Sequence, residues 1–304
     1  MVNKDSNKSV TDFKSGFVAI VGAPNVGKST LLNRLLGEKI SITSRKPQTT
    51  RNRILGVVHR PAAQIIFMDT PGVHKAKNPL NIKIVETALS TMGDADIILI
   101  LIDVAKPDPV SEGVIVKKLQ AANRPVILAL NKIDLIRKDA LLSIIDRWAA
   151  VYPFEAVVPI SATEGTQVDA LIASMENALT AGPPFFAQDT LTDLSERFIA
   201  AEIIREKIFR LTGEEIPYST AVTVDLFKEE KAGALIKIQA SIHMERSSQK
   251  GIVIGKKGAK LKQIGKASRE DLERFLGAKV YLKLFVRVQK NWSKDTKALK
   301  RLGY

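Results

Sequence analysis

The sequence predicts an α/β domain with a mostly parallel sheet and helices on both faces, followed by a smaller α+β domain. Two observations predict this order. Three short polar strings, GAPNVGKST at 22–30, DTPG at 69–72 and NKID at 131–134, each follow an apolar, β-rich run. A GKKG string at 255–258 then interrupts a helical pattern close to the C-terminus. With 304 residues, the chain is long enough for two separate cores.

The first element is an apolar strand over 16–21, preceded by a polar, charged segment, 1–15, that we expect to be flexible. The string after this strand opens a helix whose leucines recur at helical spacing, a pattern typical of a phosphate-binding loop. Lys28 is predicted to reach the β- and γ-phosphates, and the Ser29 hydroxyl to coordinate Mg²⁺. The nucleotide-binding candidates here are Gly22, Asn25, Val26, Gly27, Lys28, Ser29 and Thr30.

A polar loop over 40–51, interrupted by Pro47, follows the first helix. We expect a mobile segment, which a γ-phosphate would order and hydrolysis would release. An ordinary surface loop is the alternative. The next strand, 63–68, would deliver Asp69 to the sheet edge as a Mg²⁺ ligand and place the Gly72 N–H near the γ-phosphate. Turn chemistry alone would also explain DTPG.

The strand over 125–130 ends in the candidate base-recognition string. A carboxylate at Asp134 can accept hydrogen bonds from the ring N–H and the exocyclic amine of guanine, which adenine does not offer in that pattern. Lys132 would lie over the base, and Asn131 would join this loop to the phosphate loop. A further strand, 156–160, leads to Ser161 and Ala162, whose backbone would meet the guanine carbonyl oxygen.

The first domain is predicted to end at 181, because Gly182 and two prolines follow; 182–192 is then a linker and 193–304 the second domain. That domain is predicted to begin with a long amphipathic helix over 193–211, which has one apolar stripe. Strands over 220–226 and 234–244 follow, then paired helices across GKKG, a strand over 279–288 and a short basic tail helix over 292–304.

This order of elements is that of a type II KH domain, in which a G-x-x-G loop clamps the backbone of single-stranded RNA. A tight turn between two helices is the alternative. The sequence leaves open whether Ile252, Val253, Ile254 and Leu261 line the groove or the core. The RNA-binding candidates are Ile254, Gly255, Lys256, Lys257, Gly258, Lys260 and Lys262.

The net charge of +14 is concentrated at the C-terminal end, where 246–304 hold 17 Lys/Arg against 4 Asp/Glu. This concentration indicates a polyanionic partner, although a solvated helical face would also explain it. Without cysteines, the chain has neither disulfides nor a thiolate metal site. It also lacks a signal-peptide pattern and an apolar run long enough to span a membrane.

On these strings the chain resembles the TrmE–Era branch of the translation-factor-class GTPases, and the KH pattern narrows the resemblance to the Era family. The resemblance covers 16–304. It implies that Thr50, or else Thr49, joins Ser29 and Asp69 around Mg²⁺ when GTP is bound, and that Asn25 helps to hold K⁺ near the phosphates. Val73 stands where many GTPases have a glutamine, so we expect slow, K⁺-stimulated hydrolysis. The catalytic candidates are Lys28, Asn25, Thr50 and Gly72.

The resemblance implies a cytoplasmic GTP/GDP switch that binds the 3′ end of small-subunit ribosomal RNA and acts in 30S subunit assembly. We expect a monomer, with peripheral contact to the inner face of the membrane as a second location. Two alternatives remain at the level of sequence. One is an RNA chaperone that keeps GTP as a structural ligand, and the other is a GTPase docked on a membrane surface.

Overall fold

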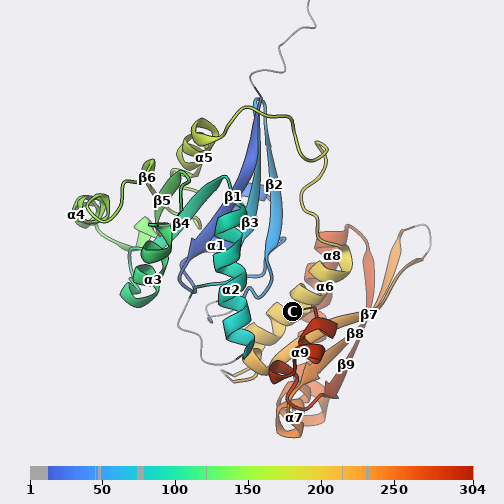
Figure 1. Cartoon of the computed structure of the whole chain (residues 1–304). Helices are drawn as coiled ribbons and strands as arrows, with labels where there is room; N and C mark the ends of the chain where they lie inside the picture. The colour runs from blue at the N-terminus through green and yellow to red at the C-terminus, as the bar shows by residue number, and fades with distance from the viewer. Residues whose placement is uncertain are drawn as a thin grey trace, which may run out of the picture. The chain divides into compact units, whose positions relative to one another are not determined.

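The computed structural model describes residues 13–303 except 45, 47–48, 74–78, 121, 214 and 231–232, and it does not describe the side chains of 79–81, 83, 84 and 87. The chain divides into two compact units. The first consists of Met1–Glu38, Arg53–Lys75 and Val85–Asp193, and the second of Lys39–Asn52, Ala76–Ile84 and Leu194–Tyr304. The predicted pairing of a larger α/β domain with a smaller α+β domain is confirmed (Figure 1).

The first unit is built on a six-stranded sheet in the order β2-β3-β1-β4-β5-β6. Only β2 runs antiparallel to its neighbour β3; the other neighbouring strands are parallel. Strands β3, β4 and β5 are buried along their whole length, as expected for apolar runs covered on both faces. The strands are β1 (Lys14–Gly22), β2 (Ile54–Arg60), β3 (Ala63–Asp69), β4 (Ile97–Asp103), β5 (Val126–Asn131) and β6 (Ala156–Ile160).

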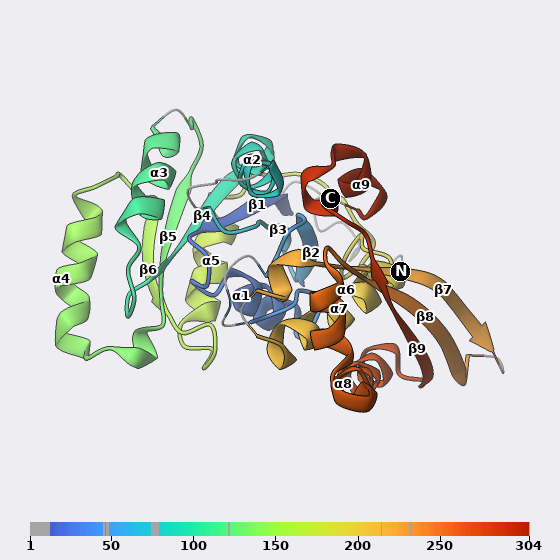
Figure 2. The ribbon, with the colours of Figure 1, turned by 90° about the horizontal axis from the view of Figure 1, so that it is seen from below.

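Helices cover both faces of this sheet. Figure 2 shows α2 and α3 on one side of it and α1 and α5 on the other. On the first side, Met92, Ile115 and Trp148 pack with side chains of β1, β4 and β5 in one apolar core. The helices are α1 (Lys28–Leu36), α2 (Pro79–Asp94), α3 (Pro109–Leu119), α4 (Lys138–Ala149) and α5 (Val168–Ala178), with a short 3₁₀ turn, η1 (Ile133–Leu135), before α4.

The boundaries of this unit differ from the predicted ones. Strand β1 begins at Lys14, inside the segment expected to be flexible, because Lys14 pairs with Ala63 of β3; residues 1–12 lie outside the described part. The segment 182–192, predicted to be a linker, packs on the first unit. Leu191 O accepts a hydrogen bond from Val57 N at 2.8 Å, which satisfies a backbone donor of edge strand β2.

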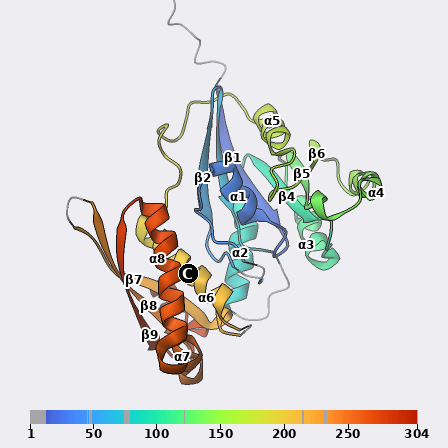
Figure 3. The same cartoon turned by 180° about the vertical axis from the view of Figure 1, so that it is seen from behind.

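The second unit has a three-stranded sheet in the order β7-β8-β9, in which β8 is antiparallel to β7 and parallel to β9. The strands are β7 (Thr220–Glu230), β8 (Leu235–Met244) and β9 (Lys279–Val288). The helices are α6 (Glu196–Leu211), α7 (Ser247–Ile254), α8 (Ala259–Leu276) and α9 (Thr296–Arg301), with 3₁₀ turns η2 (Pro217–Ser219), η3 (Lys256–Gly258) and η4 (Trp292–Lys294). Figure 3 shows α8 lying across this sheet.

Helix α6 starts three residues later than predicted. Ser195 caps it, since the Ser195 side chain accepts a hydrogen bond from Phe198 N. At the other end of the unit, Trp292 is fully buried and packs with Ala221 of β7 and with Leu299 of α9, so the tail helix is anchored to the sheet. Among the described residues, no helix is both long and apolar enough to cross a bilayer.

Candidate functional site

The predicted phosphate loop connects β1 to α1 and has the backbone that such a loop requires. Asn25 (φ 65°) and Gly27 (φ 105°) adopt left-handed conformations, which turn the chain sharply before the helix begins at Lys28. A Cβ on Gly27 would lie 2.3 Å from Asn131 Nδ2, so only glycine fits here. The N–H groups in the first turn of a helix have no acceptor within the helix, so the start of α1 offers the donors that anion binding requires.

Lys28 is buried inside this loop. Its Nζ donates hydrogen bonds to Gly22 O at 3.1 Å and Ala23 O at 2.9 Å. Burial lowers the pKa of Lys28 to about 8, while the nearby Asp69 carboxylate acts in the opposite direction. A phosphate bound in the loop would add negative charge beside this amine and raise its pKa again.

The predicted metal ligands Ser29 and Asp69 lie side by side. The Ser29 hydroxyl donates to Asp69 Oδ2 at 2.7 Å, and Asp69 is fully buried at the end of β3. The chain then passes close to the phosphate loop, since Val73 N donates to Gly22 O at 3.1 Å. A Cβ on Gly72 would meet Pro24 Cα at 2.8 Å, so the Gly72 backbone lies directly against the loop.

The predicted base-recognition loop is joined to the phosphate loop by side chains. Asn131 Nδ2 donates to Val26 O at 2.7 Å, and Asn131 Oδ1 accepts from Ala162 N at 2.9 Å. Lys132 Nζ donates to Asn25 O at 2.8 Å. Asp134 is exposed in η1, with its carboxylate accessible to a ligand. Residues from the ends of β1, β3, β5 and β6 thus meet at the carboxyl edge of the sheet, where open α/β sheets bind ligands.

Two residues that the sequence did not single out hold this arrangement. Asp103, at the end of β4, lies 2.5 Å from Lys132 Nζ and accepts hydrogen bonds from Ala105 N and Lys106 N. Its place after an apolar strand was a usable signal. Arg34 of α1 donates to Ala162 O at 3.3 Å and so supports the loop after β6. No local pattern marked Arg34, because its partner lies 128 positions away in sequence.

The predicted switch threonines belong to the second unit. Thr50 and Thr49 are both buried there, in the 39–52 segment that packs with residues 194–304. Thr49 O accepts a hydrogen bond from the buried Arg205 of α6. Ser29 and Asp69 belong to the first unit. The role of Thr50 as a Mg²⁺ ligand stays a prediction.

Four basic residues fasten this 39–52 segment or its surroundings. Arg51 donates hydrogen bonds to three backbone carbonyls: Thr220 O at 2.9 Å, Pro217 O at 3.0 Å and Tyr218 O at 3.1 Å. Its guanidinium carbon also lies 5.7 Å from the centroid of the Trp292 ring. Lys46 Nζ donates to Phe209 O at 2.7 Å and Thr212 O at 2.6 Å.

Lys39 and Lys207 both contact the Asp271 carboxylate. Burial would raise the pKa of Asp271, but hydrogen bonds from Lys207 and Lys39 outweigh it and lower this pKa to about 2.

The site chemistry fits a nucleotide with Mg²⁺. A serine hydroxyl and a carboxylate at hydrogen-bond distance are the oxygen ligands that Mg²⁺ takes when phosphates complete its shell. The glycines before Lys28 have no Cβ, so a phosphate can come close to the backbone of the loop. In the described part of the chain, no cluster of three or more His, Cys, Asp or Glu could hold a metal ion by itself.

The GKKG string forms the predicted loop between α7 and α8. Gly255 (φ 71°), Lys257 (φ 51°) and Gly258 (φ 79°) are left-handed, and a Cβ on Gly255 would lie 2.7 Å from Lys260 Cβ. Beside the loop is a groove of about 570 Å³ between α8 and β9. Its lining includes Gly258, Leu261, Lys262, Gly265, Lys266, Arg269, Leu282 and Leu284.

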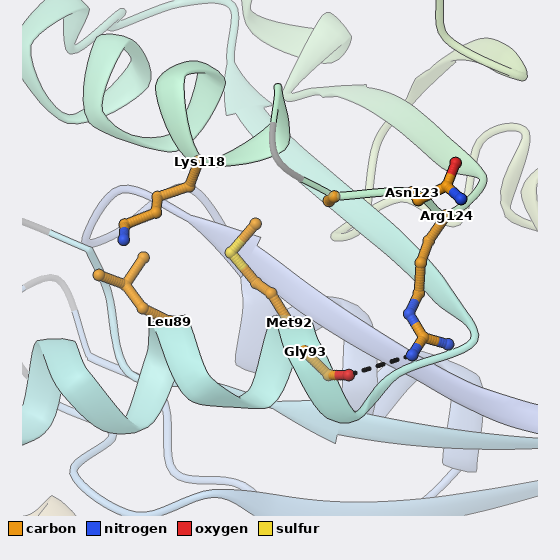
Figure 4. Close-up of a pocket in the computed structure, with 7 residues that line it drawn as sticks. Leu89, Met92, Gly93, Lys118, Asn123 and Arg124 are labelled. Carbon is orange, nitrogen blue, oxygen red and sulfur yellow. Dashed lines mark hydrogen bonds between the residues drawn. The ribbon is translucent and has the colours of Figure 1, made fainter.

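The four apolar residues whose position the sequence left open differ in burial, and Ile254 is half-buried. Leu261 lines the groove, whereas Val253 is fully buried in the core and Ile252 is 54% exposed. A second hollow, of about 490 Å³, lies in the first unit between α2, α3 and the start of β5 (Figure 4). It is lined by Met92, Lys118 and Arg124 among others and lies at the amino edge of β4 and β5, opposite the edge that carries the nucleotide motifs.

Comparison with known proteins matches both units. Residues 17–132 match the family described as 50S ribosome-binding GTPase, and residues 215–293 match the KH domain. The chain is 56% identical over 292 residues to GTPase Era of Geobacter metallireducens, covering 96% of this chain and 98% of that protein. It is 55% identical, with the same coverage, to GTPase Era of Geotalea uraniireducens.

Two solved structures cover nearly the whole chain. One is a crystal structure of Era in complex with MgGDPNP and nucleotides 1506–1542 of 16S ribosomal RNA, with 44% identity, a TM-score of 0.92 and coverage of 96% of this chain and 99% of that chain. The other is an Aquifex aeolicus Era variant bound to GDP·AlF4⁻, with 43% identity, a TM-score of 0.92 and the same coverage.

Proposed function

The chain belongs to the Era family of GTPases, and on that premise we propose that it is a switch that binds small-subunit ribosomal RNA and acts in 30S subunit assembly. The chain is a GTPase with a KH domain, and its cofactors are GTP or GDP with Mg²⁺. The observation that carries the proposal is the presence, on one chain, of a nucleotide site at the sheet edge and a basic groove beside GKKG.

The protein contributes positioning and charge to hydrolysis of GTP. The N–H groups at the start of α1 and the Lys28 amine would hold the phosphates, and Asp134 would hold the guanine edge. Ser29 and Asp69 would hold Mg²⁺, which neutralises developing charge on the phosphate oxygens. Hydrolysis then needs a water in line with the γ-phosphate. The Gly72–Val73 backbone, held against the phosphate loop by the hydrogen bond from Val73 N to Gly22 O, would lie beside that phosphate.

We infer that Asn25 helps to hold a K⁺ ion that accelerates this step. Asn25 is exposed in the phosphate loop, and Val73 offers no side chain to orient the water. Turnover should therefore be higher in K⁺ than in Na⁺ buffer, and Asn25→Asp should change the ratio of the two rates. Equal rates in both buffers would refute the role of K⁺ and leave the GTPase assignment untouched.

The 39–52 segment is the proposed link between nucleotide and RNA. It includes Thr50, the expected GTP-dependent Mg²⁺ ligand, and Arg51, which is bonded to three carbonyls of the KH unit. A segment that serves both purposes makes nucleotide state and KH packing interdependent. If GTP favours RNA binding, RNA must then favour GTP by the same factor.

For the RNA target, we propose the 3′ end of small-subunit ribosomal RNA. Support comes from the related Era crystallised with nucleotides 1506–1542 of 16S ribosomal RNA and from the 17 Lys/Arg against 4 Asp/Glu over 246–304. We further propose a cytoplasmic monomer, with the basic C-terminal region as the contact for any peripheral association with the membrane.

The test is GTP turnover in K⁺ buffer with and without a single-stranded RNA copied from that 3′ end. The control variant is Lys256→Asp/Lys257→Asp, which reverses the loop charge and keeps both glycines; a Cβ on Gly255 would instead clash with α8. We expect RNA to increase turnover in the wild type and not in the variant. Turnover that responds to RNA equally in both would contradict the proposed use of the groove.

A further inference from the structure

Strand β9 has two chemically different faces. Its residues alternate strictly between apolar and basic or aromatic side chains. On the inner side, Val280 is buried, and Leu282 and Leu284 line the groove beside α8. On the other side, which we call the outer face of β9, are Lys279, Tyr281, Lys283, Phe285 and Arg287, all exposed.

The two aromatic rings on this face are unusually accessible. Tyr281 is 51% exposed and Phe285 is 41% exposed. Helix α6 contacts β7, α7 contacts β8 and β9, and α8 contacts β9. The alternate β8 residues in register with the inner side of β9 are buried: Ile236, Ile238, Ala240, Ile242 and Met244. At the outer side, α9 packs near Ala221, which is in register with His243 close to the C-terminal end of β8. Tyr281 is in register with Lys237, towards the other end of β8, so α9 and Tyr281 lie at opposite ends of the outer side.

The outer face of β9 is also positively charged. Among the described residues, neither Lys279 nor Lys283 forms an ion pair. Two other cations lie near acids of β7: Lys237 is 2.7 Å from Glu230, and Arg287 is 3.6 Å from Asp225. Free lysines beside exposed rings are the combination that binds single-stranded nucleic acid, in which phosphates meet cations and bases stack on aromatics.

We propose that the outer face of β9 is a second RNA-contact surface, on which nucleotides flanking the groove-bound segment stack on Tyr281 and Phe285. This inference rests on the proposed RNA binding in the groove. Strand β9 is an edge strand, so the groove and the outer face are separated by the thickness of one strand. A strand of RNA clamped at GKKG reaches the outer face by passing around that edge. Tyr281 and Phe285 are about 13 Å apart at the rise of a β-strand, which suits two separate, unstacked bases.

The experiment compares two single-stranded RNAs from the same 3′ end segment: a 6-mer that fills the groove, and a 16-mer. Dissociation constants are measured by fluorescence anisotropy for the full-length protein with a non-hydrolysable GTP analogue. In Tyr281→Ser/Phe285→Ser we expect about tenfold or greater loss of affinity for the 16-mer, from two lost stacking contacts. Affinity for the 6-mer should stay within twofold.

A second variant, Tyr281→Leu/Phe285→Leu, keeps apolar side chains on the strand and removes only the rings, so that impaired folding does not imitate the result. It should lose affinity for the 16-mer as the serine variant does. Lys279→Gln/Lys283→Gln should flatten the salt dependence for the 16-mer by about 1.4 in log–log slope, whereas Lys117→Gln/Lys118→Gln on α3 loses the same charge and should not.

The outcomes separate the two claims. If wild-type protein binds neither RNA, the proposed RNA binding itself is wrong. If it binds both and the ring variants leave the ratio of the two affinities unchanged, the groove stands and the outer face of β9 is not an RNA surface.

Discussion

Lys28 makes nucleotide binding sensitive to pH. In the free protein its pKa is about 8, since burial disfavours the charged amine. Bound phosphates stabilise the charged form, so the pKa is higher in the complex than in the free protein. Nucleotide affinity is therefore highest below pH 8. Above pH 8 it falls by up to about tenfold per pH unit, until the pH reaches the pKa of Lys28 in the complex.

Calorimetric titration of GDP between pH 7 and pH 9 measures this slope. The control Lys28→Met has no titrating amine in the loop and should bind weakly with little dependence on pH over the same range. Wild-type affinity that stays constant across the range would show that Lys28 is charged to the same extent in both states.

Asp134 is predicted to select guanine. Because it is exposed in the free structure, Asp134→Asn should leave the thermal unfolding midpoint nearly unchanged. Loss of hydrogen bonds to a charged acceptor, about 1.5–3 kcal/mol each, should weaken GTP binding at least a hundredfold. The same variant should gain affinity for XTP, whose base has a carbonyl in place of the exocyclic amine. GTP affinity equal to that of the wild type would exclude Asp134 from the base site.

For single residues, local sequence patterns predict the side chains that would contact the nucleotide. They miss the residues that hold those side chains in place. The strings around Lys28, Asp69 and Asn131 are contiguous and chemically distinctive, so the sequence alone identifies them. Asp103 and Arg34 act through partners 29 and 128 positions away in sequence. Both pairs depend on the folded topology. The position of Asp103 after an apolar strand is the one local signal, and Arg34 has none.

Among the elements, α6 departs most from its predicted character. The sequence indicates an amphipathic helix with one apolar stripe, yet residues 199–209 are buried all round, with Glu202, Arg205, Glu206 and Lys207 among them. The reason is that the 39–52 segment packs against the face expected to be solvated. Lys39 Nζ lies 2.6 Å from Glu206 Oε2, and Arg205 is bonded to Glu202 and to Thr49 O. Periodicity reports where apolar residues lie, but not which polar face another segment will cover.

We predict that Arg51→Lys loosens the 39–52 segment. A single ammonium cannot reproduce the planar guanidinium that meets three carbonyls, so buried acceptors lose partners. Hydrogen exchange followed by mass spectrometry should show at least tenfold faster exchange in peptides from 39–52, with little change in β4 and β5 of the first unit.

A matched control is Arg53→Lys, two positions along the chain and outside the carbonyl cluster, which should leave exchange in 39–52 as in the wild type. Exchange that is unaffected by Arg51→Lys would mean that these three hydrogen bonds do not hold the segment.

For the whole molecule, the sequence predicted the fold class and the order of the domains, but not how the chain is shared between them. Composition placed a linker at 182–192, whereas Gln64 accepts hydrogen bonds from Phe185 N and Phe186 N and holds that stretch on the first unit. Conversely, the sequence places the loop over 40–51 in the first domain, whereas the 39–52 segment belongs to the second unit. Both departures come from contacts between segments far apart in sequence, which propensity and periodicity do not report.

We propose that the nucleotide state of the GTPase unit controls RNA binding by the KH domain. The most direct measurement is the affinity of the full-length protein for the ribosomal 3′ end RNA with a non-hydrolysable GTP analogue and with GDP, paired with the affinity for the analogue with and without RNA. We expect tighter RNA binding in the GTP state, and an equal factor in the reciprocal measurement. RNA affinity that is the same in both nucleotide states would contradict it.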